Sequence, residues 1–264
     1  MPPLRADLSA VLTTSSVMLT AGVTVLDRDT GQVTEQLNPD LPFRSASVVK
    51  LLVVLDFLWD RGTAYEIPAE DRARLEVMLR SSDDDAASYY WDELGGGAIV
   101  DRMVQRLGLT HTTRPPATHP GFWGYVAITA ADTVRIYQYL LDQAPAPVRE
   151  FVMGQLHQPT RYGTDGFDQY FGIASAFSGD FSIKQGWSGF LGSGRSRETD
   201  AGIDLTSEAL HTTGTVGPGD RAIVAVYTLH PVGTPYEQAY ADVTELVRAL
   251  DIPGPAKPGV PDAG

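Results

Sequence analysis

Strand-like stretches lie near both ends of the chain, where β-branched and other apolar residues gather between turn residues. Near the amino end, Thr20–Asp27 and Gln32–Leu37 flank a turn at residues 29–31, which predicts a β-hairpin. The second half of the chain predicts three more strands, at Asp180–Gly186, Glu208–Val216 and Arg221–Leu229. The sequence Gly-Pro-Gly-Asp at residues 217–220 predicts a tight turn between the last two of these strands.

The middle of the chain has the periodicity of helices. Its most apolar stretch, Ala46–Trp59, is apolar on nearly every side, which predicts a buried central helix. The valines at its start would also suit a strand, but its length favours a helix. Further helices are predicted at residues 5–12, 68–80, 86–94, 99–107, 129–141 and 236–250. Thr110–Tyr125, rich in Pro, Gly, His and aromatic residues, is predicted to be a loop.

This order of elements predicts an α/β protein of the α+β kind, in which the hairpin joins the three later strands in one five-stranded antiparallel sheet. We expect the first and last helices to cover that sheet. The sheet lobe would comprise residues 1–45 and 170–252, and a reduced all-helical lobe would comprise residues 46–169. Residues 253–264 are predicted to be a flexible Pro/Gly tail. Clefts between such lobes are common ligand sites.

Composition narrows the possible partners. The chain has 264 residues, a net charge of −13 and no basic run, which argues against nucleic acid or an anionic membrane surface as a partner. It has no cysteine and no apolar stretch long enough to cross a bilayer. The histidines do not have metal-ligand spacing, so we predict no metal and no cofactor. The amino end does not have the pattern of a signal peptide.

Lysine is rare in this chain, which has 3 lysines among its 20 basic residues: Lys50, Lys184 and Lys257. Lys257 lies in the predicted tail. Arginine keeps its proton in proteins, whereas a buried lysine can be tuned to act as a base. The other two lysines are therefore candidates for catalytic chemistry.

The first candidate group is Ser47-Val48-Val49-Lys50, at the head of the predicted buried helix. Residues three apart lie on one helix face, so the amine of Lys50 can activate the hydroxyl of Ser47 as a nucleophile. Backbone N–H groups at a helix start can also receive a developing oxyanion. The alternative is a serine that caps the helix beside an unrelated lysine.

Two further groups fit the same chemistry. In Ser82-Asp83-Asp84, Ser82 would relay a proton and Asp84 would bind a substrate amide or Lys50; the alternative is a helix cap. In Lys184-Gln185-Gly186-Trp187, Lys184 would lie at the cleft rim and either hold a carboxylate or polarise Ser82. Gly186 would let a ligand pair with the strand edge, and the N–H of Trp187 would meet the oxyanion. The predicted substrate-binding residues are therefore Asp84, Gln185, Gly186 and Trp187.

In this order, the three groups resemble the Ser-x-x-Lys, Ser-Asp-Asn and Lys-Thr-Gly signature of class A β-lactamases and penicillin-binding proteins. The resemblance covers residues 8–250 and implies a β-lactamase/transpeptidase-like fold. It also implies a serine hydrolase that forms an acyl-enzyme at Ser47. Lys50, Ser82 and Lys184 would act with Ser47. The implied partner is a small-molecule or peptide acyl substrate, such as a β-lactam, a D-Ala-D-Ala-like peptide or an ester. Members of the family are usually exported, although this sequence shows no export signal.

The chain departs from the family pattern at three places. Asp84 replaces the Asn, and Gln185 replaces the Thr or Ser. Between Asp101 and Asp132 the chain has no Asp or Glu, whereas class A β-lactamases carry a glutamate there that activates the deacylating water. We therefore expect weak or no β-lactam turnover. The alternatives are a catalytically silent binding or sensing module, and an esterase or acyltransferase of secondary metabolism.

Overall fold

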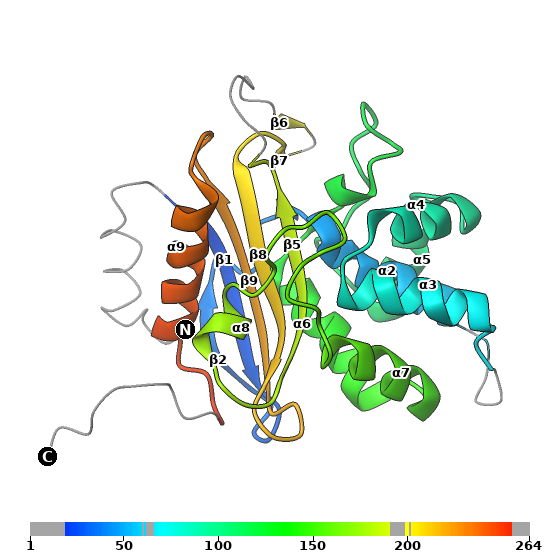
Figure 1. The fold of residues 1–264 in the computed structure, drawn as a ribbon, viewed down its shortest axis with the longest axis horizontal. Coiled ribbons are helices and arrows are strands. Elements are labelled where there is room, and N and C mark those ends of the chain that lie inside the picture. Colours follow the sequence, from blue (N-terminus) through cyan, green and yellow to red (C-terminus); the bar gives the residue numbers. More distant parts are fainter. Residues whose placement is uncertain (1–18, 60, 62–65, 191–198, 201, 255–264) are drawn as a thin grey trace, which may run out of the picture.

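The structure, a computed structural model, describes residues 19–59, 61, 66–190, 199–200 and 202–254. At its centre is the predicted five-stranded antiparallel sheet, in the order β2-β1-β9-β8-β5 (Figure 1). Its strands are β1 (Thr20–Asp27), β2 (Gln32–Leu37), β5 (Phe181–Ser188), β8 (Glu208–Val216) and β9 (Ala222–His230). The hairpin thus joins the later strands through the pairing of β1 with β9, and β5 forms one edge of the sheet.

The predicted α+β class is confirmed, and most of the predicted helices are present within a few residues. The longer helices are α2 (Lys50–Leu58), α3 (Ala69–Arg80), α4 (Asp84–Glu93), α5 (Ala98–Leu107), α6 (Ala130–Gln138), α7 (Ala146–Leu156) and α9 (Tyr236–Ala249). A short helix, α8 (Ile173–Ala176), and α7 were not predicted. The predicted helix at residues 5–12 and most of the predicted tail lie outside the described residues.

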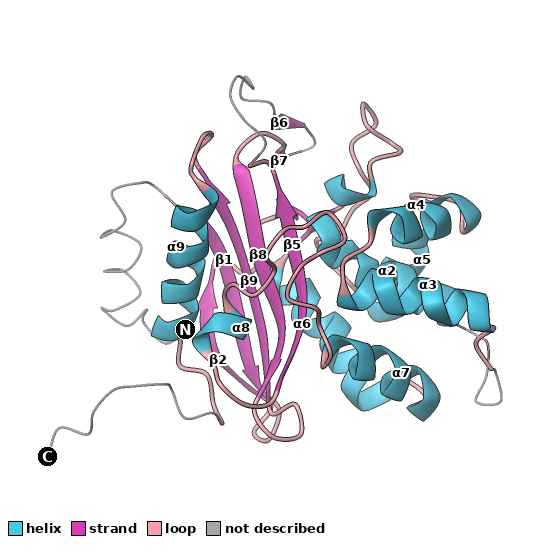
Figure 2. Cartoon of the chain, viewed as in Figure 1, coloured by secondary structure: helices cyan, strands magenta, loops and turns pink. Residues whose placement is uncertain are grey.

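The helices form two layers around the sheet (Figure 2). On one face, α8 and α9 pack on the sheet in an apolar cluster that includes Val23 and Val224 of the sheet and Leu246 of α9. On the other face, α6 packs against β1 and β9, and α2 to α5 extend the same core away from the sheet. All nine residues of α2 are buried, as expected for the central helix.

A small two-stranded sheet fixes the start of the central helix. Its strands β3 (Phe43–Arg44) and β4 (Ala127–Ile128) pair in antiparallel fashion, and the backbone N–H of Ser45 donates to the carbonyl of Val126. The segment before Ser47 is therefore joined to the end of the loop at Thr110–Tyr125. A second pair, β6 (Thr199–Asp200) and β7 (Ile203–Asp204), lies beyond the end of β5.

Candidate active site

Ser47 and Lys50 are brought together by a tight helical turn. The predicted helix begins as a 3₁₀ turn at Ala46–Val49, labelled η1, which continues directly into α2. In a 3₁₀ turn, side chains three residues apart lie one above the other, so the two functional groups face each other. The Nζ of Lys50 donates a hydrogen bond of 2.9 Å to the Oγ of Ser47.

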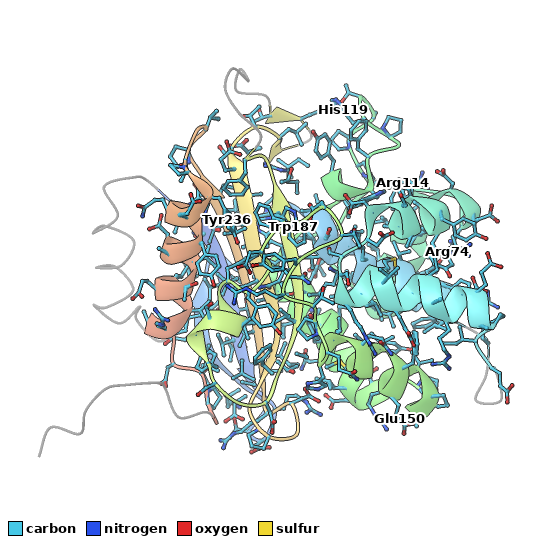
Figure 3. The ribbon with its side chains drawn as sticks, viewed as in Figure 1. Arg74, Arg114, His119, Glu150, Trp187 and Tyr236 are labelled. Atoms are coloured by element: carbon cyan, nitrogen blue, oxygen red, sulfur yellow. The ribbon has the colours of Figure 1, made fainter. Side chains whose placement is uncertain are left out.

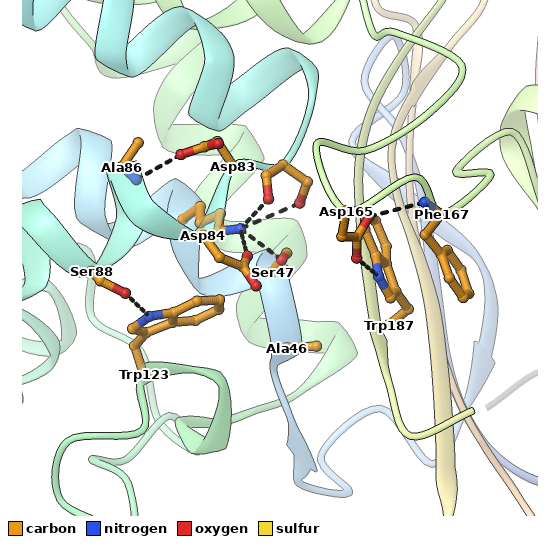
Figure 4. A network of polar contacts seen from close by, with 12 residues as sticks. Ala46, Ser47, Asp83, Asp84, Ala86, Ser88, Trp123, Asp165, Phe167 and Trp187 are labelled. Carbon is orange, nitrogen blue, oxygen red and sulfur yellow. Dashed lines mark hydrogen bonds and ion pairs between the residues drawn. The ribbon is translucent and has the colours of Figure 1, made fainter. Parts of the chain in front are cut away.

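The amine of Lys50 is enclosed by polar partners and has no exposed surface. It donates at 2.6 Å to the carbonyl of Ser82 and at 2.6 Å to Oδ1 of Asp84, and it lies 4.7 Å above the ring of Trp123 (Figure 4). Burial lowers the pKa of Lys50, and the charge of Asp84 opposes this effect. Lys50 therefore loses its proton more readily than an exposed lysine.

Ser82 links the two lysines. It follows α3 with a φ of 56°, a left-handed conformation that is uncommon outside glycine. Its Oγ accepts from the Nζ of Lys184 at 2.8 Å and lies 3.4 Å from the Nζ of Lys50. The hydroxyls of Ser47 and Ser82 and both amines thus form one connected group.

Lys184 lies deeper than expected. It is 1% exposed, so the structure does not place it at the rim of a cleft. Burial, together with the positive charge of Lys50, holds the pKa of Lys184 well below its usual range, and Asp84 only partly opposes them. This position favours the polarising contact with Ser82 over direct contact with a ligand.

Alternation along β5 separates the remaining predicted residues. Gly186 shares the face of Lys184, and a Cβ built there would lie 2.9 Å from the carbonyl oxygen of Ser45, so glycine lets η1 approach the strand. Gln185 points to the opposite face, where its Nε2 donates to the carbonyls of Gln169 and Phe171. The structure therefore does not bring the side chain of Gln185 into the group around Ser47.

Trp187 lies at the edge of the site, on the strand of the sheet that packs against η1 (Figure 3). Its ring stacks on Phe167 with centroids 4.9 Å apart, and its Nε1 donates to Asp165 at 2.9 Å. The indole N–H is thus already bonded. An oxyanion contact from this residue would have to come from its backbone N–H.

Ser47 opens into a cavity of about 470 Å³, whereas both lysines lie behind its wall. The residues that line the cavity are Ala46, Ser47, Asp84, Ser88, Gly121, Phe122, Trp123, Gly124, Tyr125, Trp187 and Ser188. A volume in this range suits a small-molecule ligand.

Much of the wall comes from the loop at Thr110–Tyr125, called the aromatic loop below, which was not predicted to be part of the site. The ring of Trp123 covers Lys50, and its Nε1 donates to the Oγ of Ser88 at 3.2 Å. Phe122 stacks on Tyr125, and His119 meets both rings edge-on. The many aromatic residues of this loop were the sequence feature that could have predicted its place at the site. No sequence feature could have predicted that Asp165 bonds to Trp187 there.

Neither a metal-ligand cluster nor a helix fit to cross a membrane is present among the described residues. No three His, Cys, Asp or Glu side chains there come together as metal ligands would. No helix in that part of the chain is both long and apolar enough to cross a membrane.

Comparison with solved structures shows the fold. The chain superimposes on beta-lactamases from Xanthomonas campestris pv. campestris (TM-score 0.68, 16% identity), Mycobacterium abscessus (class A; 0.66, 17%) and Streptomyces albus G (0.63, 19%). These matches cover 93%, 92% and 91% of this chain and 95%, 96% and 96% of the respective neighbours.

Comparison with named sequences shows a nearer relationship. No family model matches the chain. The protein named "Putative lipoprotein LppW", from Mycobacterium bovis and from Mycobacterium tuberculosis, is 34% identical to it over 237 residues. That alignment covers 88% of this chain and 69% of LppW. The chain therefore belongs to the LppW family and has the fold of class A beta-lactamases.

Proposed function

We propose that the protein is a serine acyl hydrolase of the penicillin-recognising type, with Ser47 as the nucleophile. The observation that carries this proposal is the 2.9 Å hydrogen bond from the buried amine of Lys50 to a hydroxyl that lines the cavity. A desolvated lysine is one of the few groups that can activate a serine.

In this mechanism, Lys50 takes the proton of Ser47 as Oγ attacks an amide, ester or lactam carbonyl. The backbone N–H groups of Ser47 and Trp187 stabilise the oxyanion. Ser82 relays the proton that Lys50 took from Ser47 to the leaving group, because its Oγ lies 3.4 Å from the Nζ of Lys50 and is held by a hydrogen bond of 2.8 Å from Lys184. The depth of Lys184 favours this role over holding a substrate carboxylate.

The substrate class is a small acyl compound: an ester, a D-Ala-D-Ala-like peptide or a β-lactam. β-Lactam turnover should be weak, because the chain between Asp101 and Asp132 contains no acidic residue that could activate water there.

Intact-mass spectrometry with a fluorophosphonate, benzylpenicillin and p-nitrophenyl acetate tests the nucleophile. We expect an adduct of one acyl or phosphonyl group on the wild type and none on Ser47→Ala. Ser88→Ala is the matched control, because Ser88 lines the same cavity but does not bond to Lys50. If none of the three probes forms an adduct on the wild type, or if the adduct also forms on Ser47→Ala, the proposal is wrong.

A second function, a binding or sensing module that does not turn over, is favoured by one contact. The Nζ of Lys50 lies 2.6 Å from Oδ1 of Asp84, an ion pair that stabilises the protonated amine, and a protonated amine cannot act as a base. This function predicts ligand binding, or a permanent adduct on Ser47, with no steady-state product.

The related LppW is named a lipoprotein, and this name supports a further part of the proposal, that the protein acts outside the cytoplasm. Cell fractionation, followed by protease treatment of intact cells, tests it. Protein found only in the cytoplasmic fraction would contradict it.

A further inference from the structure

Asp84 is placed differently from the other polar groups near Ser47. Its side chain is 66% exposed and lines the cavity, whereas the amine bonded to its Oδ1 is fully enclosed. The carboxylate therefore touches the buried proton-transfer group on one side and the cavity on the other. A single nitrogen atom, the Nζ of Lys50, separates it from the Oγ of Ser47.

Asp84 is also the only carboxylate among the described residues that line the cavity. The nearby Asp165 is occupied, because one of its oxygens accepts from the indole of Trp187 and the other from the backbone N–H of Phe167. An ester on Ser47 would therefore meet one acidic side chain in the cavity that could accept a proton from water.

We propose that Asp84 is the general base that deacylates the enzyme, an inference that rests on the proposed function. In the acyl-enzyme, water adds to the carbonyl carbon while its proton moves to the carboxylate of Asp84. The tetrahedral intermediate then collapses, and the bond between that carbon and the Oγ of Ser47 breaks. The acyl group leaves as a carboxylic acid.

The contact between Asp84 and Lys50 closes the cycle. The proton taken by Asp84 moves along the 2.6 Å hydrogen bond to the Nζ of Lys50, and from there along the 2.9 Å hydrogen bond to the Oγ of Ser47. Both residues then regain their starting protonation states, and no other reactant than water is needed.

Asp84→Asn tests the proposal because the amide keeps the shape and the hydrogen-bonding oxygen but cannot accept the proton. With p-nitrophenyl acetate we expect a burst of about one p-nitrophenol per enzyme, followed by a steady state slowed by about 100-fold or more. Intact mass should show the acetyl group accumulating on Ser47.

Asp85→Asn is the matched control. Asp85 carries the same charge, is exposed and lies one residue further along α4, but it does not line the cavity. It should behave as the wild type does. Asp84→Glu, which restores a carboxylate, should recover part of the steady-state rate, and thermal unfolding checks that each variant is folded.

The outcomes separate this inference from the proposed function. If neither the wild type nor Asp84→Asn is ever acylated, the proposed function is wrong. If both are acylated but the adducts disappear at rates within about threefold of each other, the role of Asp84 is overturned and the acyl-enzyme proposal stands.

Discussion

At the scale of single residues, the most unusual environment is that of Lys184. Among the described residues, its amine donates to the hydroxyl of Ser82 and to the carbonyl of Gln185, and to no carboxylate. Burial and the charge of Lys50 hold its pKa well below the usual range. A lysine whose pKa is lowered by folding reduces stability at neutral pH, because the unfolded chain binds the proton more tightly than the folded chain does.

Replacing Lys184 with methionine should therefore stabilise the protein and impair acylation. We expect the midpoint of thermal unfolding at pH 7 to rise by roughly 2–4 °C, the shift given by about 1 kcal/mol in a chain of this size. The gain should shrink near pH 10.5, where the unfolded chain also loses this proton. A lower midpoint at pH 7, or an unchanged rate of acylation by p-nitrophenyl acetate, would contradict this account.

At the scale of elements, the site depends on how closely η1 approaches β5. Gly186 lies at this approach, because an added Cβ there would lie 2.9 Å from the carbonyl oxygen of Ser45 and 3.1 Å from Cγ2 of Val48. Both contacts belong to the segment that carries Ser47. Any side chain at position 186 would push the nucleophile away from its partners.

Gly186→Ala should destabilise the fold by about 1–3 kcal/mol, the usual cost of overpacking, and should slow acylation. Gly154→Ala is the control: this glycine lies within α7, a Cβ there would meet nothing within 4 Å, and alanine favours helix. Urea unfolding measures both free energies. Equal stability of the two variants would show that the contact at Gly186 is unimportant.

At the scale of the whole molecule, α7 is joined to the sheet by a charged contact. His157, which follows α7, has its Nε2 2.9 Å from Oδ1 of Asp220 in the turn between β8 and β9, and its Nδ1 2.9 Å from the carbonyl of Phe181. Only protonated histidine can donate to both oxygens. The hydrogen bond with Asp220 accordingly raises the pKa of His157 above 6.5.

The sign of this shift predicts how stability depends on pH. The contribution of His157 should be fully present below pH 6.5 and lost as the pH rises through the raised pKa of the folded state. His157→Asn should thus lower the free energy of unfolding by roughly 0.5–1 kcal/mol at pH 5.5 and by less at pH 8.5. Urea unfolding at these two pH values measures the difference, and an effect that grows with pH would refute it.

Most helices and strands of this protein could be predicted from its sequence, because strand and helix periodicity are local properties. The hairpin of β1 and β2 agrees with its predicted bounds, and α2 was evident from its continuous apolar run. In α7, Gly154 weakens the helical signal, and packing in the core around Phe151 and Val152 compensates for it. Local pattern could not show that compensation.

The same division holds for the site. Ser47 and Lys50 are three residues apart, so one helical turn was enough to pair them. Ser82 and Lys184 are 102 residues apart, and their contact depends on the packing of α3 against the rest of the core and on the position of β5. Strand alternation turned Gln185 away from the cavity, and packing of the aromatic loop brought Trp123 over Lys50. Residue type and spacing therefore predicted which side chains could carry the chemistry of the site. Their burial, and the contacts between residues far apart in the sequence, depend on tertiary packing and could not be predicted.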